Sequence, residues 1–339
     1  MCLLVVAHFL YCQVRLIHQT TTQNGSDDIT RNDIQHSLNA GCKKAALILF
    51  GVPKHFPIIW KSYIQNIIQR NPQIKDFEVY MHMYSDLHQQ PFTNSKNGEI
   101  NATLESPDDI RAVFDDENNQ VDIQAKLTTT SQSTFDEIEL SWLQESDTTF
   151  FHNYSFPTLK NIFRQGNSLR EAYHYLQTEK RKEQSNNDID VYIFARPDTF
   201  LMSPIDIPCK GLDDDEVWVP GSWGVWWGTN DRFAIAGRNA ANVYANRIYG
   251  YKDAVLARRI NLMEIELDIH KETVFPPPPP PPQFNNSETL LRTWLLGNNV
   301  KIIPQMEKWA KLLRVRADGR MVPKLKEWIR LTNGSGSSL

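Results

Sequence analysis

The sequence lacks the short motifs that mark the commonest nucleotide and hydrolase sites. Its 339 residues contain no G-x-S-x-G, no P-loop and no G-x-G-x-x-G. Their absence argues against the common hydrolase, nucleoside triphosphatase and dinucleotide-binding classes. There is also no C-x-x-C pair and no Cys/His cluster that would suggest zinc. The net charge is -4, and nucleic-acid binding needs a clustered basic surface, so we expect no nucleic-acid partner.

Cysteine is scarce, with four residues in the chain. Cys2 and Cys12 lie in the apolar N-terminal segment, which leaves Cys42 and Cys209. These two either form a disulfide in an oxidising compartment or are buried free thiols. The sequence leaves both alternatives open.

The apolar N-terminal run is short. Residues 1–14 are almost wholly apolar, which fits the about 7–15 residues of a signal-peptide core but not the about 20 residues of a membrane span. The first basic residue, Arg15, follows the run instead of preceding it, which is unusual for either kind of leader. A signal peptide, a short signal anchor that associates with the membrane, and an incomplete gene start all remain open.

Sequons of the form N-x-S/T agree with secretory entry, because they accept glycans only in the secretory lumen. They begin at Asn24, Asn101, Asn153, Asn285 and Asn333. We therefore expect the chain in the ER or Golgi lumen, or secreted.

Composition divides the chain into a polar lead-in and one large domain. Pro276 to Pro282 is an unbroken run of prolines, which predicts an exposed, extended loop. The predicted parts are a signal peptide or anchor (1–14), a polar, disordered stem (15–42), the α/β domain (43–325) with a loop-rich insertion (85–150) and a Pro-rich loop (271–286), and a flexible tail (326–339).

Hydrophobic patterning predicts an α/β fold. Residues 45–50 form a continuous apolar run, residues 60–67 have apolar side chains at helical spacing, and residues 77–83 alternate. This is a β-α-β opening, which predicts a parallel strand pair. Further strands are expected at 191–195, 217–219, 233–236 and 300–303, and helices at 159–176, 240–249 and 288–296, the last with Ser287 as N-cap.

The most informative segment runs from Val191 to Thr199, where an apolar strand leads directly into Arg-Pro-Asp. Open α/β sheets bind ligands beyond the carboxyl ends of their strands. We therefore expect Arg196 and Asp198 to emerge together into an open crevice. Asp198 would hold a divalent cation or a sugar hydroxyl, and Arg196 would neutralise phosphate oxygens. The structural alternative is an Arg–Asp pair that caps the strand.

Five segments together resemble a known group of proteins. They are RPDT (196–199), WVP (218–220), NDRFAIAG (230–237), SETLL (287–291) and RVRADG (314–319). In this order they resemble uncharacterised glycosyltransferase-like proteins with a GT-A-type nucleotide-sugar-binding fold, in which R-x-D replaces D-x-D. The resemblance covers roughly residues 43–320 and implies a mostly parallel sheet with helices on both faces.

By this resemblance, Asp198 takes the place of the metal-binding second aspartate of D-x-D. The cofactor would then be Mn²⁺ or Mg²⁺. Arg196 departs from the pattern, because it removes one anionic ligand and adds a fixed positive charge near the phosphates. Metal dependence is therefore in doubt.

The remaining candidates surround this motif. Donor phosphates would also contact Gly51, Lys54, Arg316 and Asp318, and the acceptor would contact Trp227, Asn230 and Arg232. Asp231 and Glu288 are the candidates for hydroxyl binding and deprotonation. The alternative to acceptor binding by Trp227 is that the tryptophans fill the core. The alternative at Glu288 is an acid that the helix dipole favours in the first turn of a helix.

We predict transfer of a sugar from a nucleotide-diphosphate donor to a hydroxyl of a glycan, lipid or protein. The rival hypothesis is a luminal or secreted carbohydrate-binding protein that lacks catalysis. A glycosidase is a third alternative, for which the sequence establishes no facing pair of carboxylates.

Overall fold

The computed structural model describes residues 42–86, 92–94, 98–100, 104–116, 123–151, 154–182, 189–209, 211–220, 229–257, 286–305, 311–316, 319 and 321–322. Several sequence predictions lie outside these residues. They concern the leader, the stem, the five sequons, the Pro-rich loop, the tail, Trp227 and Asp318. Within the described ranges, no helix is both long and apolar enough to cross a membrane.

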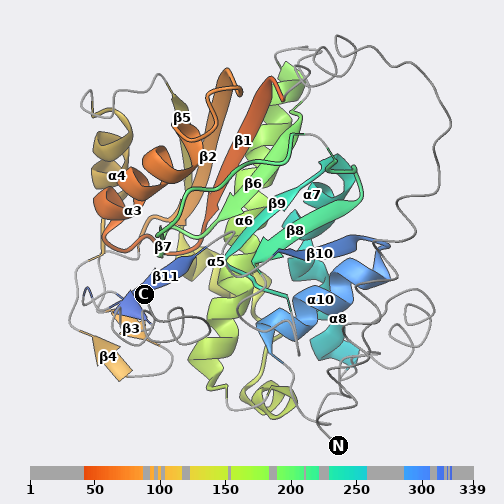
Figure 1. Cartoon of the computed structure of the whole chain (residues 1–339). Coiled ribbons are helices and arrows are strands. Elements are labelled where there is room, and N and C mark those ends of the chain that lie inside the picture. Colours follow the sequence, from red (N-terminus) through yellow and green to blue (C-terminus); the bar gives the residue numbers. More distant parts are fainter. Residues whose placement is uncertain are drawn as a thin grey trace, which may run out of the picture. The chain divides into compact units, whose positions relative to one another are not determined.

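A seven-stranded sheet forms the centre of the domain (Figure 1). Its strand order is β10-β8-β9-β6-β1-β2-β5, and β9 alone runs antiparallel to its neighbours. The strands are β1 (Lys44–Phe50), β2 (Asp76–Tyr84), β5 (Gln124–Thr130), β6 (Val191–Ala195), β8 (Glu216–Pro220), β9 (Phe233–Ala236) and β10 (Lys301–Gln305). The predicted parallel pairing of the first two strands is confirmed.

Helices cover both faces of this sheet (Figure 1). On one face lie α3 (Phe56–Tyr63), the π-helical turn η1 (Ile64–Ile68) and α4 (Pro107–Phe114). On the other lie α5 (Gln132–Glu139), the 3₁₀ turn η4 (Glu145–Phe150), α6 (Phe156–Lys182), α7 (Arg238–Ala245), α8 (Arg247–Ala257) and α10 (Ser287–Gly297). The predicted α/β class with a mostly parallel sheet is confirmed.

The central strand β1 shows why the sheet is buried on both faces. All seven of its residues are buried. Ala46 and Ile48 pack into the core with α6 and α7, whereas Leu47 and Leu49 pack against α3. Alternating residues of a strand point to opposite faces, so a continuous apolar run is what a two-sided core requires.

Two smaller sheets complete the described strands. β7 (Thr199–Leu201), β11 (Leu312–Val315) and β12 (Met321–Val322) form an antiparallel sheet, and β3 (Phe92–Asn94) pairs with β4 (Gly98–Ile100). The predicted loop-rich insertion contains β3, β4, α4, β5, α5 and η4. Its strand β5 joins the central sheet, which the sequence pattern did not predict.

A disulfide joins Cys42 to Cys209, with their Cα atoms 4.9 Å apart. It links Cys42, two positions before β1, to the segment after β7, 167 positions later in the chain. Of the two alternatives left open by the sequence, the structure therefore has the disulfide.

Candidate functional site

The candidate site lies where β6 ends and the chain turns into β7. Pro197 has no backbone N–H, so the β6 ladder stops before it. The backbone N–H of Lys54, after β1, donates to the Pro197 carbonyl over 3.3 Å. β11 pairs with β7 (Figure 1). This pairing places Arg314 opposite Thr199. Three segments far apart in the sequence thus meet at one strand end.

Asp198 lies at the centre of this meeting point and binds three cations. Arg196 donates from Nε to Oδ1 over 2.9 Å and from Nη2 to Oδ2 over 2.8 Å. Lys54 Nζ and Arg314 Nε lie 3.1 and 3.0 Å from Oδ2. Burial alone would raise the pKa of Asp198, but the three cations hold it well below its ordinary value.

The prediction that Arg196 and Asp198 emerge into an open crevice is wrong for the carboxylate. Asp198 is 1% exposed, and the Arg196 side chain is 12% exposed. The two side chains form a bidentate pair, as the structural alternative required. Half-buried arginine residues gather at this strand end: Arg196 of the pair itself, Arg314, which also binds Asp198, and Arg232. The accessible chemistry at this strand end is therefore cationic.

This donor set does not fit a divalent cation at Asp198. Both carboxylate oxygens accept hydrogen bonds from cationic donors, and Mn²⁺ or Mg²⁺ needs several free oxygen ligands. Within the described residues, no group of three or more His, Cys, Asp or Glu side chains is placed to hold a metal ion. We therefore assign no step to a metal at Asp198.

Asp231 and Glu288 form the second part of the site. The hydroxyl of Ser287 lies 3.0 Å from Glu288 Oε2 and 3.4 Å from Asp231 Oδ2. Gln165 on α6 joins the two parts, because its Oε1 accepts from Arg196 Nη1 over 3.1 Å and its Nε2 lies 3.5 Å from Asp231 Oδ2. Arg196 Nη1 is also 3.9 Å from Asp231 Oδ2. The structure therefore brings the two predicted catalytic carboxyl groups together.

The two carboxyl groups have opposite pKa shifts. Burial would raise the pKa of Asp231, but the surrounding guanidinium groups, Arg196 first among them, lower it below its ordinary value. Burial and the neighbouring Asp231 charge raise the pKa of Glu288. Two interacting carboxyl groups with separated pKa values are what acid–base chemistry uses, and Glu288 is the more basic of the pair.

The lysine of the site is also perturbed. Lys54 is 4% exposed, and burial lowers its pKa to about 8 in spite of the Asp198 charge. The ammonium group therefore loses its charge as pH rises through about 8, whereas the arginines of the site stay charged. Gly51, at the end of β1, has a φ of 104° that favours glycine, and its N–H donates to Ser168 Oγ over 2.8 Å.

Asn230 and Arg232 lie in the turn before β9. Asn230 is 4% exposed, and its Oδ1 accepts from the Arg232 N–H over 2.9 Å. The Arg232 carbonyl accepts from the Arg196 N–H over 3.0 Å. Asn230 therefore shapes the turn that carries Asp231, and Arg232 attaches that turn to the end of β6.

Ser287 is not the N-cap of α10, contrary to the prediction from its sequence position. Asn286 is the cap, and its Oδ1 accepts from the Thr289 N–H over 2.8 Å. Because the cap position is already filled by Asn286, the Ser287 hydroxyl is left to face Asp231 and Glu288. The N–H of Thr229 donates to the Glu288 carbonyl over 2.9 Å, which fixes α10 against the turn before β9.

Sequence reasoning missed four residues of this site, namely Gln165, Ser287, Arg247 and Arg314. Arg314 could have been found, because it begins the RVRADG segment (314–319) that also contains the predicted Arg316. Arg316 itself is 9% exposed. Arg247 is buried over the rings of Phe50 and Tyr244, its charge helps to lower the pKa of Asp231, and no motif marks it.

No protein-family model matches the chain, and no curated protein matches it. The solved structures that match it include the following two. The apo form of mouse xyloside xylosyltransferase 1 has 9% identity and a TM-score of 0.36, and the match covers 77% of this chain and 84% of that one. The galactosyltransferase LgtC, in complex with donor and acceptor sugar analogues, has 8% identity and a TM-score of 0.29, with 65% and 66% covered.

Proposed function

We propose that the chain is a glycosyltransferase that moves a sugar from a nucleotide-diphosphate donor to a hydroxyl of a glycan, lipid or protein. One observation carries the proposal. Half-buried arginine residues gather at the paired Asp198, and a carboxyl pair with separated pKa values lies beside them. A diphosphate leaving group needs the first feature, and an acceptor hydroxyl needs the second.

The donor diphosphate would contact the guanidinium groups of Arg196, Arg232 and Arg314. Guanidinium groups bind phosphate oxygens bidentately. As the bond between the sugar and the diphosphate breaks, the leaving oxygen keeps the electron pair, and fixed positive charge stabilises it. In this role Asp198 holds the cations in position and does not contact the donor itself.

The acceptor hydroxyl would be bound between Asp231 and Glu288. Asp231 is ionised and accepts a hydrogen bond from the hydroxyl. Glu288, as the more basic carboxylate, takes its proton while the new bond to the sugar forms. Ser287 positions the Glu288 carboxylate through the 3.0 Å hydrogen bond.

The test is donor hydrolysis and transfer by the purified full-length chain, with a panel of UDP- and GDP-sugars in Mn²⁺ or EDTA. We expect turnover of at least one donor, with Glu288→Gln lowering turnover by about a hundredfold or more. Glu139→Gln, a change at a surface helix residue, is the matched control and should not alter turnover. No hydrolysis of any donor, or equal turnover in Glu288→Gln, would contradict the proposal.

A second candidate is a carbohydrate-binding protein without catalysis. The buried, fully paired Asp198 favours it, because the carboxylate expected to serve the donor is occupied by cations of the same chain. Glycan binding by a chain that shows no affinity for UDP or GDP would support this candidate over the transferase.

For the location, we propose the secretory lumen or the cell exterior. The Cys42–Cys209 disulfide supports it, because such bonds persist in oxidising compartments. Golgi residence, glycosylation and membrane association through the N-terminus belong to the same proposal. Mass spectrometry of glycans on the chain, with N-terminal sequencing of the secreted or microsomal product, tests all three.

A further inference from the structure

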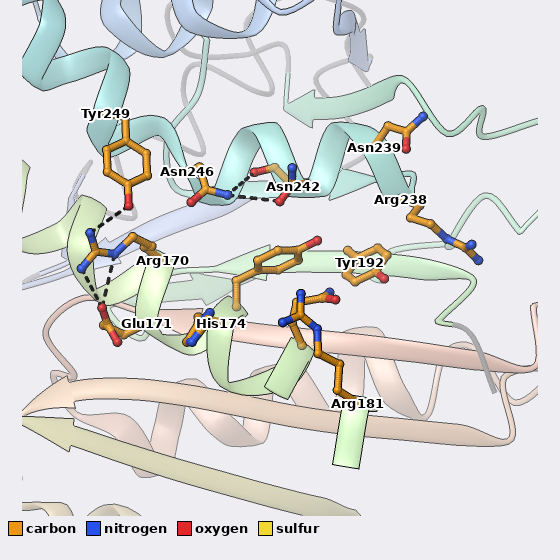
Figure 2. Close-up of a pocket in the computed structure, with 12 residues that line it drawn as sticks. Arg170, Glu171, His174, Arg181, Tyr192, Arg238, Asn239, Asn242, Asn246 and Tyr249 are labelled. Atoms are coloured by element: carbon orange, nitrogen blue, oxygen red, sulfur yellow. Dashed lines mark hydrogen bonds and ion pairs between the residues drawn. The ribbon is translucent and has the colours of Figure 1, made fainter. Parts of the chain in front are cut away.

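A groove of about 760 Å³ lies between α6 and α7, away from the candidate site. Figure 2 shows Asn239, Asn242 and Asn246 along the α7 wall, with Arg170, His174 and Arg181 on the α6 side. Its volume falls in the range of small-molecule sites, about 300–1,000 Å³. None of its lining residues belongs to the candidate site, and α6 packs closely on α8, where a Cβ on Gly166 would lie 3.1 Å from Ile248 Cβ.

The groove carries more positive than negative charge. Arg170, Arg181 and Arg238 line it, against the single lining carboxylate of Glu171. Glu171 is already paired with Arg170, whose Nη2 donates to it over 2.8 Å. A second carboxylate, Asp215, lies beside the groove and accepts from Asn239 over 2.9 Å.

Arg181 is the most available of these cations. Its side chain is exposed and makes no hydrogen bond or ion pair with any residue that the structure describes. Arg238 is likewise exposed, at the start of α7. In Figure 2 both lie toward the end of the groove opposite the Arg170–Tyr249 contact. This end of the groove therefore provides two exposed guanidinium groups for an anion.

The wall between the two ends is rich in carboxamides. Asn246 Nδ2 donates a hydrogen bond to Asn242 Oδ1 over 3.2 Å. Gln177 lines the same space. A carboxamide both donates and accepts hydrogen bonds, as does a sugar hydroxyl. Tyr249 adds an exposed aromatic ring, 48% exposed, at the other end. Amides with an aromatic ring suit a sugar, and guanidinium groups suit an acidic substituent on it.

We propose that the groove between α6 and α7 is a second binding site, for an oligosaccharide that carries carboxylate or sulfate groups. Arg181 and Arg238 bind the acidic groups, and Asn242 and Asn246 bind the hydroxyls. The site does not depend on the transferase proposal, because it shares no lining residue with the candidate catalytic site.

Isothermal titration calorimetry on the full-length chain tests the proposal with three tetrasaccharides: a heparin-derived one, a galacturonate one and neutral maltotetraose. At least one acidic ligand should bind at least tenfold more tightly than the neutral one. Arg181→Ala with Arg238→Ala should weaken that binding at least tenfold. The control pair Lys61→Ala and Lys75→Ala removes the same charge from exposed residues outside the groove and should change it less than twofold.

Asn242→Leu with Asn246→Leu separates sugar recognition from simple charge attraction. This double variant leaves the net charge unchanged and should weaken binding of the acidic tetrasaccharide at least fivefold. Thermal unfolding of each variant checks that it is folded. The proposal is overturned if neither acidic ligand binds, if the arginine variants bind as wild type does, or if inorganic tripolyphosphate binds as tightly as the tetrasaccharide. Donor hydrolysis should be unchanged in all these variants. Failure of the binding-site proposal and failure of the transferase proposal are therefore distinguishable.

Discussion

Replacement of Asp198 by Asn tests whether this carboxylate holds the site together. The substitution keeps the shape of the side chain and removes its charge. Lys54, Arg196 and Arg314 then remain close together without the anion that compensates them, and Lys54 is 4% exposed. Removal of one partner from a buried ion pair costs about 3–5 kcal/mol. We expect a loss of this size in the free energy of unfolding.

Chemical denaturation of Asp198→Asn and wild type at neutral pH measures the loss. The control is Asp206→Asn, because Asp206 forms an exposed ion pair with Arg70 in which the Asp side chain is 73% exposed, and such pairs contribute little. The pKa of Asp198 is depressed by folding, so its contribution is present above the unfolded pKa and is lost as pH falls through the folded pKa. If the free energy of unfolding of Asp198→Asn lies within about 1 kcal/mol of the wild-type value, the loss is below the cost of an unpaired buried charge. Asp198 is then not the centre of the cluster.

Lys54, the start of α10 and the disulfide each give a further prediction. Nucleotide-diphosphate affinity should fall as pH rises through about 8, because Lys54 loses its charge there and adds less to the positive charge of the site. Calorimetric titration of Lys54→Arg should show no such fall; equal profiles would show that the charge of Lys54 does not act on the diphosphate. Asn286→Ala should lower stability by about 1 kcal/mol through the lost cap and should keep its turnover. Ser287→Ala should lower turnover and keep its stability. If melting and rate measurements show that Ser287→Ala loses stability and Asn286→Ala loses turnover, the assignment is refuted. Cys42→Ser should cost about 2–5 kcal/mol in denaturation experiments, and an unchanged midpoint would show that the disulfide does not brace the domain.

Much of the sheet was predictable because its strands are buried on both faces. β1 and β6 are continuous apolar runs, and a short run of this kind is typical of a strand inside a parallel sheet. β5 was missed because its residues are polar and only partly buried. Lys126 and Thr128 occupy positions that pair with β2, and the strand is defined by this pairing and not by its own pattern.

The position of the candidate site was predictable from the sequence, but the burial and pairing of its residues were not. Strand ends mark where ligand-binding residues gather, and Arg196, Asp198, Asp231 and Glu288 do gather there. Burial of Asp198 depends on Arg314 and Lys54, which arrive from segments more than a hundred residues away. The sequence placed Lys54 and the segment that contains Arg314 near the donor, but it carries no sign that either residue pairs with Asp198. The role of Asn286 as cap was equally hidden, because Ser287 beside it is also a favoured capping residue.

The most direct test of the central claim is UDP and GDP binding to the full-length chain by calorimetry, in EDTA and in Mn²⁺. Our account predicts binding in EDTA within about threefold of that in Mn²⁺, with Arg232→Ala at least tenfold weaker, as for loss of a charge-assisted phosphate contact, and the exposed control Arg70→Ala unchanged. Binding that requires Mn²⁺, or that Arg232→Ala leaves intact, would contradict the claim that the arginines gathered at this strand end recognise the donor diphosphate.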